Sequence, residues 1–170
     1  MILDGFRKLN IQRRIKKELL RSNSLKASVN QKVDTVLILV DKNSQENLDQ
    51  IIAKKLNIDI LKVIVIFFKS KQDSDSHFKN ELSKRDFYLF GKLKREEIKK
   101  LVQSKFDLLL NYTNNNQYLN CVTAFSKANF KVGLKNNQQE IFDLVIDVDK
   151  ENVDLFHNEL IKYLKILNKI

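Results

Sequence analysis

The sequence predicts an α/β protein, a three-layer Rossmann-like sandwich with a mostly parallel sheet of about five or six strands and an added basic helix at the N-terminus. Short apolar runs, each long enough for one buried strand, alternate along the chain with longer segments whose apolar residues recur every three or four positions. This alternation implies right-handed crossovers and helices on both faces of a parallel sheet. The third observation is an excess of positive charge at one end of the chain.

The predicted strands are apolar runs bounded by polar residues. "VDTVLILVD" (33–41) and "KVIVIFF" (62–68) are typical of strands that are buried on both faces. "DFYLFG" (86–91) predicts a shorter third strand. The later strands are expected at 106–112, 130–134 and 142–148.

The predicted helices are the amphipathic segments between these strands. They are expected within 43–58, 94–106 and 114–128 and from about Glu151 onward. Asn43, with Glu46 three residues later, is the predicted N-cap of the first of them. The polar connection 69–84 is of a length that is usually either functional or poorly ordered.

Length and composition predict one domain in a reducing compartment. A chain of 170 residues buries a sizeable core without disulfides, so we expect a helical extension over 1–32 and a single α/β domain over 33–170. The sequence has neither an apolar run long enough to span a bilayer nor a secretory signal pattern, which favours a cytoplasmic protein. The single cysteine, Cys121, excludes an internal disulfide and any multi-cysteine metal site, and its spacing from Tyr118 and Phe125 predicts a packed core thiol.

Positive charge is concentrated in the N-terminal extension. Residues 1–32 carry nine Lys or Arg against two acids, a net of +7, whereas the other 138 residues carry 22 against 19, a net of +3. A general bias toward lysine explains a basic protein but not this uneven distribution.

A helix over residues 2–21 separates two kinds of side chain. At 100° per residue, Ile11, Ile15 and Leu19 form a seam opposite a basic ridge of Arg7, Arg14, Lys17 and Arg21, and we expect the helix to pack on at least one side. In the plainest alternative, the seam covers an exposed side of the sheet. The second apolar face consists of Ile2, Phe6, Leu9 and Leu20. The residues predicted to bind an anion are Arg7, Arg13, Arg14, Lys17 and Arg21.

Several partners fit the basic helix. Because arginine forms bidentate contacts with phosphate and no DNA-reading motif is present, RNA or the ribosome is the favoured partner of a non-enzymatic protein. The absence of an evident aromatic platform for stacking bases counts against RNA. Peripheral attachment to an anionic membrane, with Leu3 among the inserted residues, and binding of a protein partner use the same helix. A helix that only packs, with solvated arginines, is the plainest alternative.

A small enzyme is the remaining alternative, with a ligand site at the carboxyl ends of the strands. The candidate residues there are Asp41, Asn111 and Asp147, although polar residues at such positions commonly cap the following helix. The turn after the first strand lacks the glycines of dinucleotide-binding and P-loop motifs, so no cofactor is predicted. His77 and His157 have no metal-ligand spacing, so no metal is predicted.

One segment carries a resemblance. "FDLLLNYTNNNQYLNCVTAFSKANFKVGL" (106–134) resembles a recurring segment in a family of short, uncharacterised bacterial α/β proteins with basic N-termini. It is more weakly similar to one βαβ unit of heptosyltransferase-like GT-B glycosyltransferases, which need two such domains. The resemblance depends on Phe106, Asp107, Ser126, Ala128, Val132 and Gly133. It implies a fold and no activity.

Overall fold

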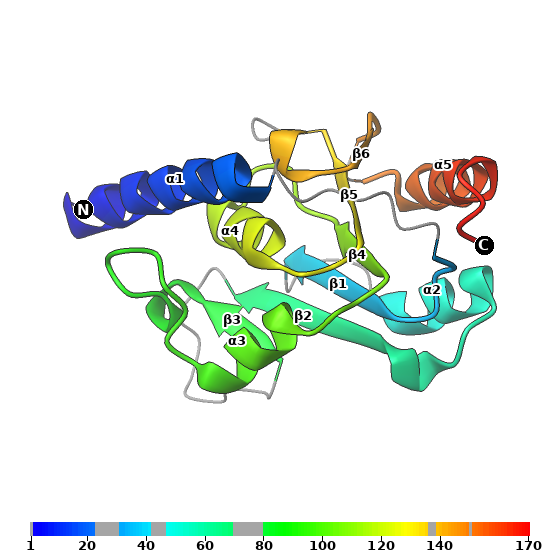
Figure 1. The fold of residues 1–170 in the computed structure, drawn as a ribbon, viewed down its shortest axis with the longest axis horizontal. Helices are drawn as coiled ribbons and strands as arrows, with labels where there is room; N and C mark the ends of the chain where they lie inside the picture. Colours follow the sequence, from blue (N-terminus) through cyan, green and yellow to red (C-terminus); the bar gives the residue numbers. More distant parts are fainter. Residues whose placement is uncertain (1, 23–30, 42–46, 70–79, 136–138, 150) are drawn as a thin grey trace.

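The computed structural model describes residues 2–22, 31–41, 47–69, 80–135, 139–149 and 151–170. Within them it confirms the predicted fold class, because six strands form one all-parallel sheet with five α-helices around it (Figure 1). The predicted N-terminal helix is present as α1 (Ile2–Ser22).

The strand order places the first strand in the middle of the sheet. The strands are β1 (Val36–Asp41), β2 (Val63–Lys69), β3 (Glu81–Ser83), β4 (Leu108–Asn111), β5 (Phe130–Leu134) and β6 (Leu144–Ile146), in the order β3-β2-β1-β4-β5-β6. The neighbours β1 and β4 are buried along almost their whole length, as their continuous apolar sequences require. The chain reverses its winding direction between them, and ligands of doubly wound folds bind at this position.

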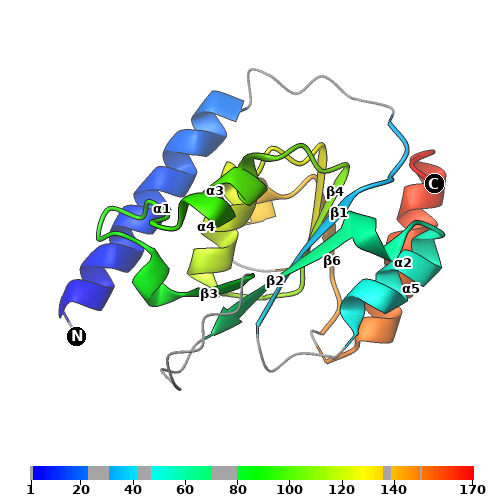
Figure 2. The same cartoon turned by 90° about the horizontal axis from the view of Figure 1, so that it is seen from below.

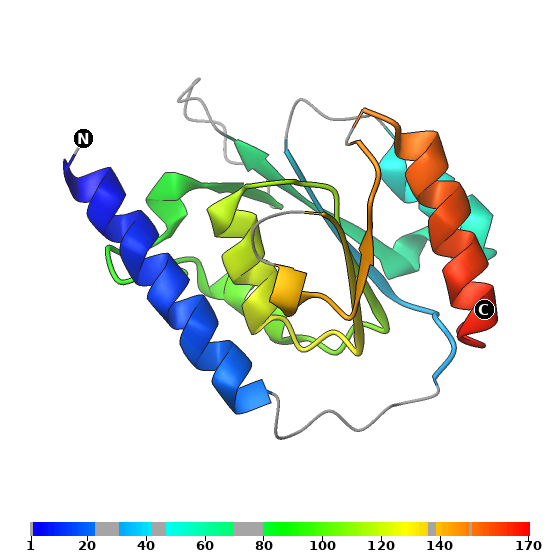
Figure 3. The same cartoon turned by 90° about the horizontal axis from the view of Figure 1, so that it is seen from above.

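Helices cover both faces of the sheet and separate two hydrophobic clusters. On one face lie α3 (Glu96–Gln103) and α4 (Gln117–Phe125), and on the other lie α2 (Leu48–Leu56) and α5 (Val153–Ile166) (Figures 2 and 3). Short 3₁₀ turns occur at Ile60–Lys62, Lys84–Asp86 and Gln139–Ile141. Alternate residues of β1 point into the two clusters, Leu37 and Leu39 toward α4, and Ile38 and Val40 toward α2 and α5.

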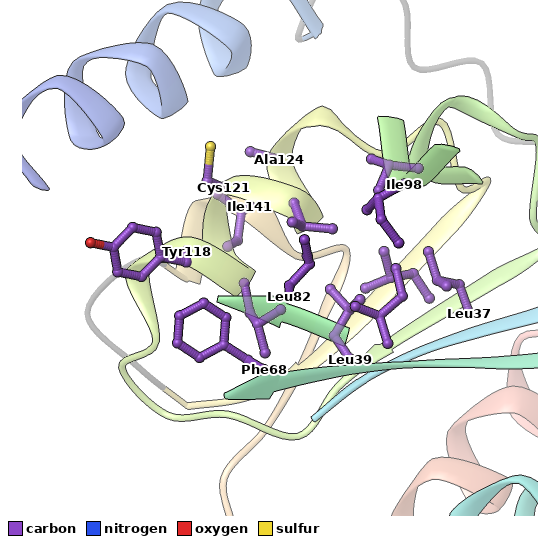
Figure 4. Close-up of a cluster of buried hydrophobic side chains, with 14 of the residues drawn as sticks. Leu37, Leu39, Phe68, Leu82, Ile98, Tyr118, Cys121, Ala124 and Ile141 are labelled. Carbon is purple, nitrogen blue, oxygen red and sulfur yellow. The ribbon is translucent and has the colours of Figure 1, made fainter. Parts of the chain in front are cut away.

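Helix α1 forms an extra layer outside α4. Ile11 and Ile15 are completely or almost completely buried, and Leu19 packs beside them, in the same cluster as Cys121 and Ala124 of α4. Figure 4 shows the side chains of Cys121 and Ala124 on the side of α4 that faces α1. The seam does pack, but not on the sheet, where the plainest alternative placed it. The seam packs against α4 and not across the sheet, because α4 already covers that part of the sheet.

The third strand lies elsewhere than predicted. Residues 86–91 end a 3₁₀ turn, form an isolated antiparallel bridge from Phe87 to Leu93 and then reverse direction at Gly91, whose φ is +74°. The strand that pairs with β2 at this edge of the sheet is β3, which lies within the polar connection. It pairs only three residues with β2, and a strand this short carries too few apolar residues to stand out in the sequence.

Helix α2 begins later than its sequence pattern indicates. Its first residue is Leu48, preceded by Asn47 in the left-handed conformation. The predicted cap Asn43 and its partner Glu46 lie outside the described residues, and so does His77.

The residues that carry the resemblance hold strands together. Asp107 Oδ2 accepts hydrogen bonds from the backbone N–H groups of Asp34 and Thr35 and from the Thr35 hydroxyl, at 2.8–3.1 Å, and so joins the start of β1 to β4. A Cβ atom on Gly133 would lie 2.4 Å from the ring of Phe142, so only glycine lets this ring pack on β5. These roles are structural.

Candidate functional site

Two of the three predicted strand-end residues lie on neighbouring strands. Asp41 ends β1, and Asn111 ends the adjacent β4. Asn116, the N-cap of α4, connects this edge to the helix, because its Nδ2 donates to Asp41 Oδ1 at 2.7 Å while its Oδ1 accepts from the N–H groups of Tyr118 and Leu119. Asp41 therefore orients a helix cap.

Asn111 has no hydrogen-bonding capacity left for a ligand. Its side chain is completely buried. Its Nδ2 donates to Asn120 Oδ1 and Thr123 Oγ1, and its Oδ1 accepts from the backbone N–H and the hydroxyl of Thr113. An asparagine amide offers two donors and two acceptor positions, and all four are used. This network fixes α4 on β4.

Asp147 does not join the other two residues. It follows β6, which is separated from β1 by β4 and β5, so the strand spacing alone puts it about 14 Å from Asp41. Its side chain is largely exposed and forms an ion pair with Lys135 at 2.5 Å. The structure thus gives the three predicted residues separate roles: Asp41 orients a helix cap, Asn111 fixes α4 on β4, and Asp147 forms an exposed ion pair.

His157 belongs to the hydrophobic core. Its ring is completely buried between α5 and the sheet, and its Nε2 lies 2.8 Å from the hydroxyl of Tyr112. Burial and the nearby Lys55 together lower the pKa of His157 to about 4, against a smaller opposing effect of Asp154, so the ring is neutral at neutral pH. Burial also raises the pKa of the Tyr112 phenol.

The side of α1 opposite the seam carries both basic and apolar residues. Arg13, Lys16, Lys17 and Arg21 are exposed on the C-terminal half of the helix, and we name these four residues the basic stripe. Leu20 lies within the stripe and is 72% exposed. Neither acid of α1 interrupts the stripe, because Glu18 lies three residues after buried Ile15, and Asp4 pairs with Arg7 and Lys84 near the other end.

Two residues of the predicted ridge lie elsewhere. Arg7 and Arg14 are half-buried at the margin of the seam, since Arg14 directly precedes Ile15 and Arg7 is one helical turn before Ile11. The Arg14 guanidinium carbon lies 4.7 Å from the centre of the Phe125 ring. The continuous exposed ridge that the helical projection implies is therefore limited to Arg13, Lys17 and Arg21, joined by Lys16.

A turn beside α1 adds exposed apolar residues. The turn at Tyr88–Phe90 lies beside the N-terminal half of α1 (Figure 1). Asn10 Nδ2 of this helix donates a hydrogen bond to the carbonyl oxygen of Leu89 at 3.2 Å. Because Gly91 has no side chain, the backbone of this turn can lie directly against Ile11. Exposed apolar side chains of both elements gather here, and we name them the apolar patch: Leu3, Phe6, Leu9, Tyr88, Leu89 and Phe90.

The described residues include no group of three or more His, Cys, Asp or Glu side chains that could hold a metal ion. None of the described helices combines the length and apolar character that crossing a bilayer requires.

Sequence reasoning missed the turn and its contribution to this surface. Three consecutive large apolar residues, Tyr88 to Phe90, look like part of a strand, but all three are exposed, which breaks the alternation of a strand. Gly91, directly after the apolar run, is the signal that could have indicated a turn.

The fold and this surface define a doubly wound α/β protein with a docked basic helix. A family model for a family of unknown function, DUF6913, matches residues 7–167, so the chain belongs to that family. The match includes most of α1 and the whole described sheet. No curated protein and no solved structure matches the chain, so the weaker resemblance to heptosyltransferase-like enzymes finds no support.

Proposed function

We propose that the protein attaches peripherally to an anionic membrane surface through α1 and the adjacent Tyr88–Phe90 turn. The observation that carries this proposal is the presence of the apolar patch and the basic stripe along the exposed length of one helix. Ile11 and Ile15 anchor that helix to the domain, so its outer side is presented as a rigid surface.

The chemistry of both halves of this surface suits a lipid headgroup layer. A helix lying in the interface inserts leucine and phenylalanine side chains and directs lysine and arginine to the phosphates. Leu3 and Leu20, which are 65% and 72% exposed, supply aliphatic contacts near both ends of α1. Each cation of the stripe contributes roughly 1 kcal/mol near an anionic surface.

RNA is the second candidate, and one observation favours it. Phe6, Tyr88 and Phe90 are exposed aromatic rings beside the basic residues, and such rings stack on unpaired bases. The exposed leucines argue for the membrane, because aliphatic side chains contribute little to contacts with phosphate or stacked bases.

Two sets of substitutions distinguish the candidates. The first, Arg13→Gln, Lys16→Gln and Lys17→Gln, removes charge; the second, Leu3→Ser and Leu20→Ser, removes aliphatic contacts. Flotation with phosphatidylglycerol-containing vesicles should be weakened about 100-fold by the first set, at about 1 kcal/mol per cation, and at least about 10-fold by the second. Binding to poly(U) should respond to the first set only.

Matched controls come from the other side of the molecule. Lys54→Gln, Lys55→Gln and Lys165→Gln remove three exposed charges from α2 and α5, and Leu61→Ser removes the most exposed leucine of the described chain. These variants should bind vesicles as the native chain does. If neither set of α1 substitutions weakens vesicle binding, the membrane proposal is contradicted. If the native chain binds poly(U) but not vesicles, RNA is the supported partner.

A further inference from the structure

A second surface feature lies beneath α1 and is separate from the proposed membrane contact. A pocket of about 250 Å³ opens between α1, α3, α4 and the segment that follows the turn. Its charged lining residues, Arg14, Lys92 and Lys99, are all basic. Its walls are apolar, with Phe87, Val102, Val122 and Phe125.

Arg14 is held in place at this pocket. Its stem passes Gly91, where a Cβ atom would lie 3.2 Å from Arg14 Cδ, and its guanidinium stacks on Phe125 with 4.7 Å between the guanidinium carbon and the ring centre. Its Nε is buried and has no hydrogen-bond partner, so the Nη groups are the donors that Arg14 can offer to a ligand.

A carboxylate is the group that would complete this arrangement. It accepts two parallel hydrogen bonds from the two Nη groups of a guanidinium, and it places negative charge among three cations. Among the described residues, Lys99 alone of the three pairs with a carboxylate, that of Glu96 at 3.1 Å on the exposed side of α3. The apolar walls would take the rest of the ligand, since small-molecule sites combine apolar walls with a few polar groups that fix orientation.

Cys121 lies in the lining of the pocket as a neutral thiol. Its Sγ is 3.8 Å from the carbonyl oxygen of Gly91, and burial raises the pKa of the thiol to about 12, although the nearby Arg14 opposes this. The thiol therefore adds to the apolar lining and is not an activated nucleophile.

We propose that this pocket binds a small organic monoanion with an aromatic or branched apolar body, whose carboxylate pairs with Arg14 and whose body packs on Phe125 and Val122. The volume is below the usual range for drug-sized ligands, roughly 300–1,000 Å³, so a one- or two-ring carboxylate fits best. This proposal does not depend on the membrane proposal, because it uses the inner margin of α1 and not its outer side.

Calorimetric titration of the full chain with 2-naphthoate, and with the neutral 2-naphthalenemethanol as its matched probe, tests the proposal. We expect saturable binding of the carboxylate and at least about tenfold weaker binding of the alcohol, because a charge-assisted bidentate pair is worth more than about 1.4 kcal/mol. Bound naphthoate should also slow the reaction of Cys121 with a thiol reagent, and Cys121 is the only thiol in the chain. Equal affinity for both probes, or no binding of naphthoate at millimolar concentration, overturns the proposal.

Three substitutions locate the binding. Arg14→Gln should weaken naphthoate binding about tenfold or more, and Lys92→Gln, at an exposed position that the fold does not need, should weaken it about threefold. Lys100→Gln, on α3 but outside the pocket lining, should leave it unchanged. If Arg14→Gln lowers the melting temperature too far for titration, the Lys92→Gln result decides. If Lys92→Gln leaves the affinity for naphthoate unchanged, the assignment of the binding to this pocket is overturned.

Discussion

His157 shows how burial converts a titratable residue into a structural one. Neutral imidazole suits its site, where Tyr112 is its hydrogen-bond partner and Phe156 packs against it edge-on. Its Nδ1 is buried without a partner, so a second proton on the ring would meet no acceptor. Protonation of this ring is therefore less favourable in the folded protein than in water.

This difference predicts an acid-labile contribution to stability. An unfolded-state histidine has a pKa of about 6.5, whereas the pKa of His157 in the folded protein is about 4. Between these values the unfolded state binds the proton and the folded state does not, so the stability from His157 is complete above about pH 6.5 and is lost progressively toward pH 4. The total loss is about 3 kcal/mol at roughly 1.4 kcal/mol per pKa unit.

Urea unfolding at several pH values measures this effect. The free energy of unfolding of the native chain should fall from neutral to acid pH more steeply than that of His157→Asn, in which the residue no longer titrates. Carboxylates titrate in both proteins, so the difference between the two curves isolates His157. Parallel curves over this pH range would contradict the assignment.

At the scale of elements, the docking of α1 depends on two isoleucines. We expect Ile15→Ala to lower the free energy of unfolding by about 2–4 kcal/mol, because it leaves a cavity between α1 and α4. Leu20→Ala on the same helix removes an equal side chain from an exposed position and should change stability by less than about 0.5 kcal/mol. The reaction rate of the Cys121 thiol should rise in Ile15→Ala only, since Cys121 faces α1 (Figure 4). Equal stabilities of the two variants would mean that the seam does not hold α1.

Sequence patterns predicted most elements because the sheet is parallel and covered on both faces. Central strands such as β1 and β4 must be apolar on both sides, and this leaves a continuous signal in the sequence. β3 was missed for the opposite reason, because an edge strand of three residues in a polar segment needs only one buried leucine, Leu82.

The candidate surface was predictable only in part. A helical projection orders residues around an axis but does not say how wide the buried sector is, so it places Arg7 and Arg14 on the exposed ridge although both are half-buried. Asn10 and Leu89 are 79 positions apart in the sequence, and their contact depends on how the turn packs against α1. Local periodicity carries no information about such a contact.

For the whole molecule, α1 and α5 lie at opposite sides, so the surface proposed to contact a membrane is well separated from the helices of the other face (Figures 2 and 3). A net charge of +10 alone would give weak, nonspecific attraction to any polyanion. The concentration of positive charge on α1 orients the molecule, because the part nearest an anionic surface feels the strongest attraction within a Debye length of about 10 Å.

Salt separates the apolar and electrostatic parts of this attachment. We expect binding to phosphatidylglycerol vesicles to weaken as salt rises from about 0.1 M to 1 M, where the Debye length falls to about 3 Å, and then to level off at a residual affinity. The residual comes from the apolar patch and Leu20, whose transfer out of water does not depend on screening. In the variant with Leu3→Ser and Leu20→Ser, the residual affinity at high salt should fall, whereas the dependence of affinity on salt at lower concentrations should stay the same. Vesicle flotation across a series of salt concentrations measures both quantities. An attachment made by charge alone would decline to nothing along a straight line in logarithmic salt, as phosphate contacts with RNA do, and that result would exclude insertion of the apolar patch.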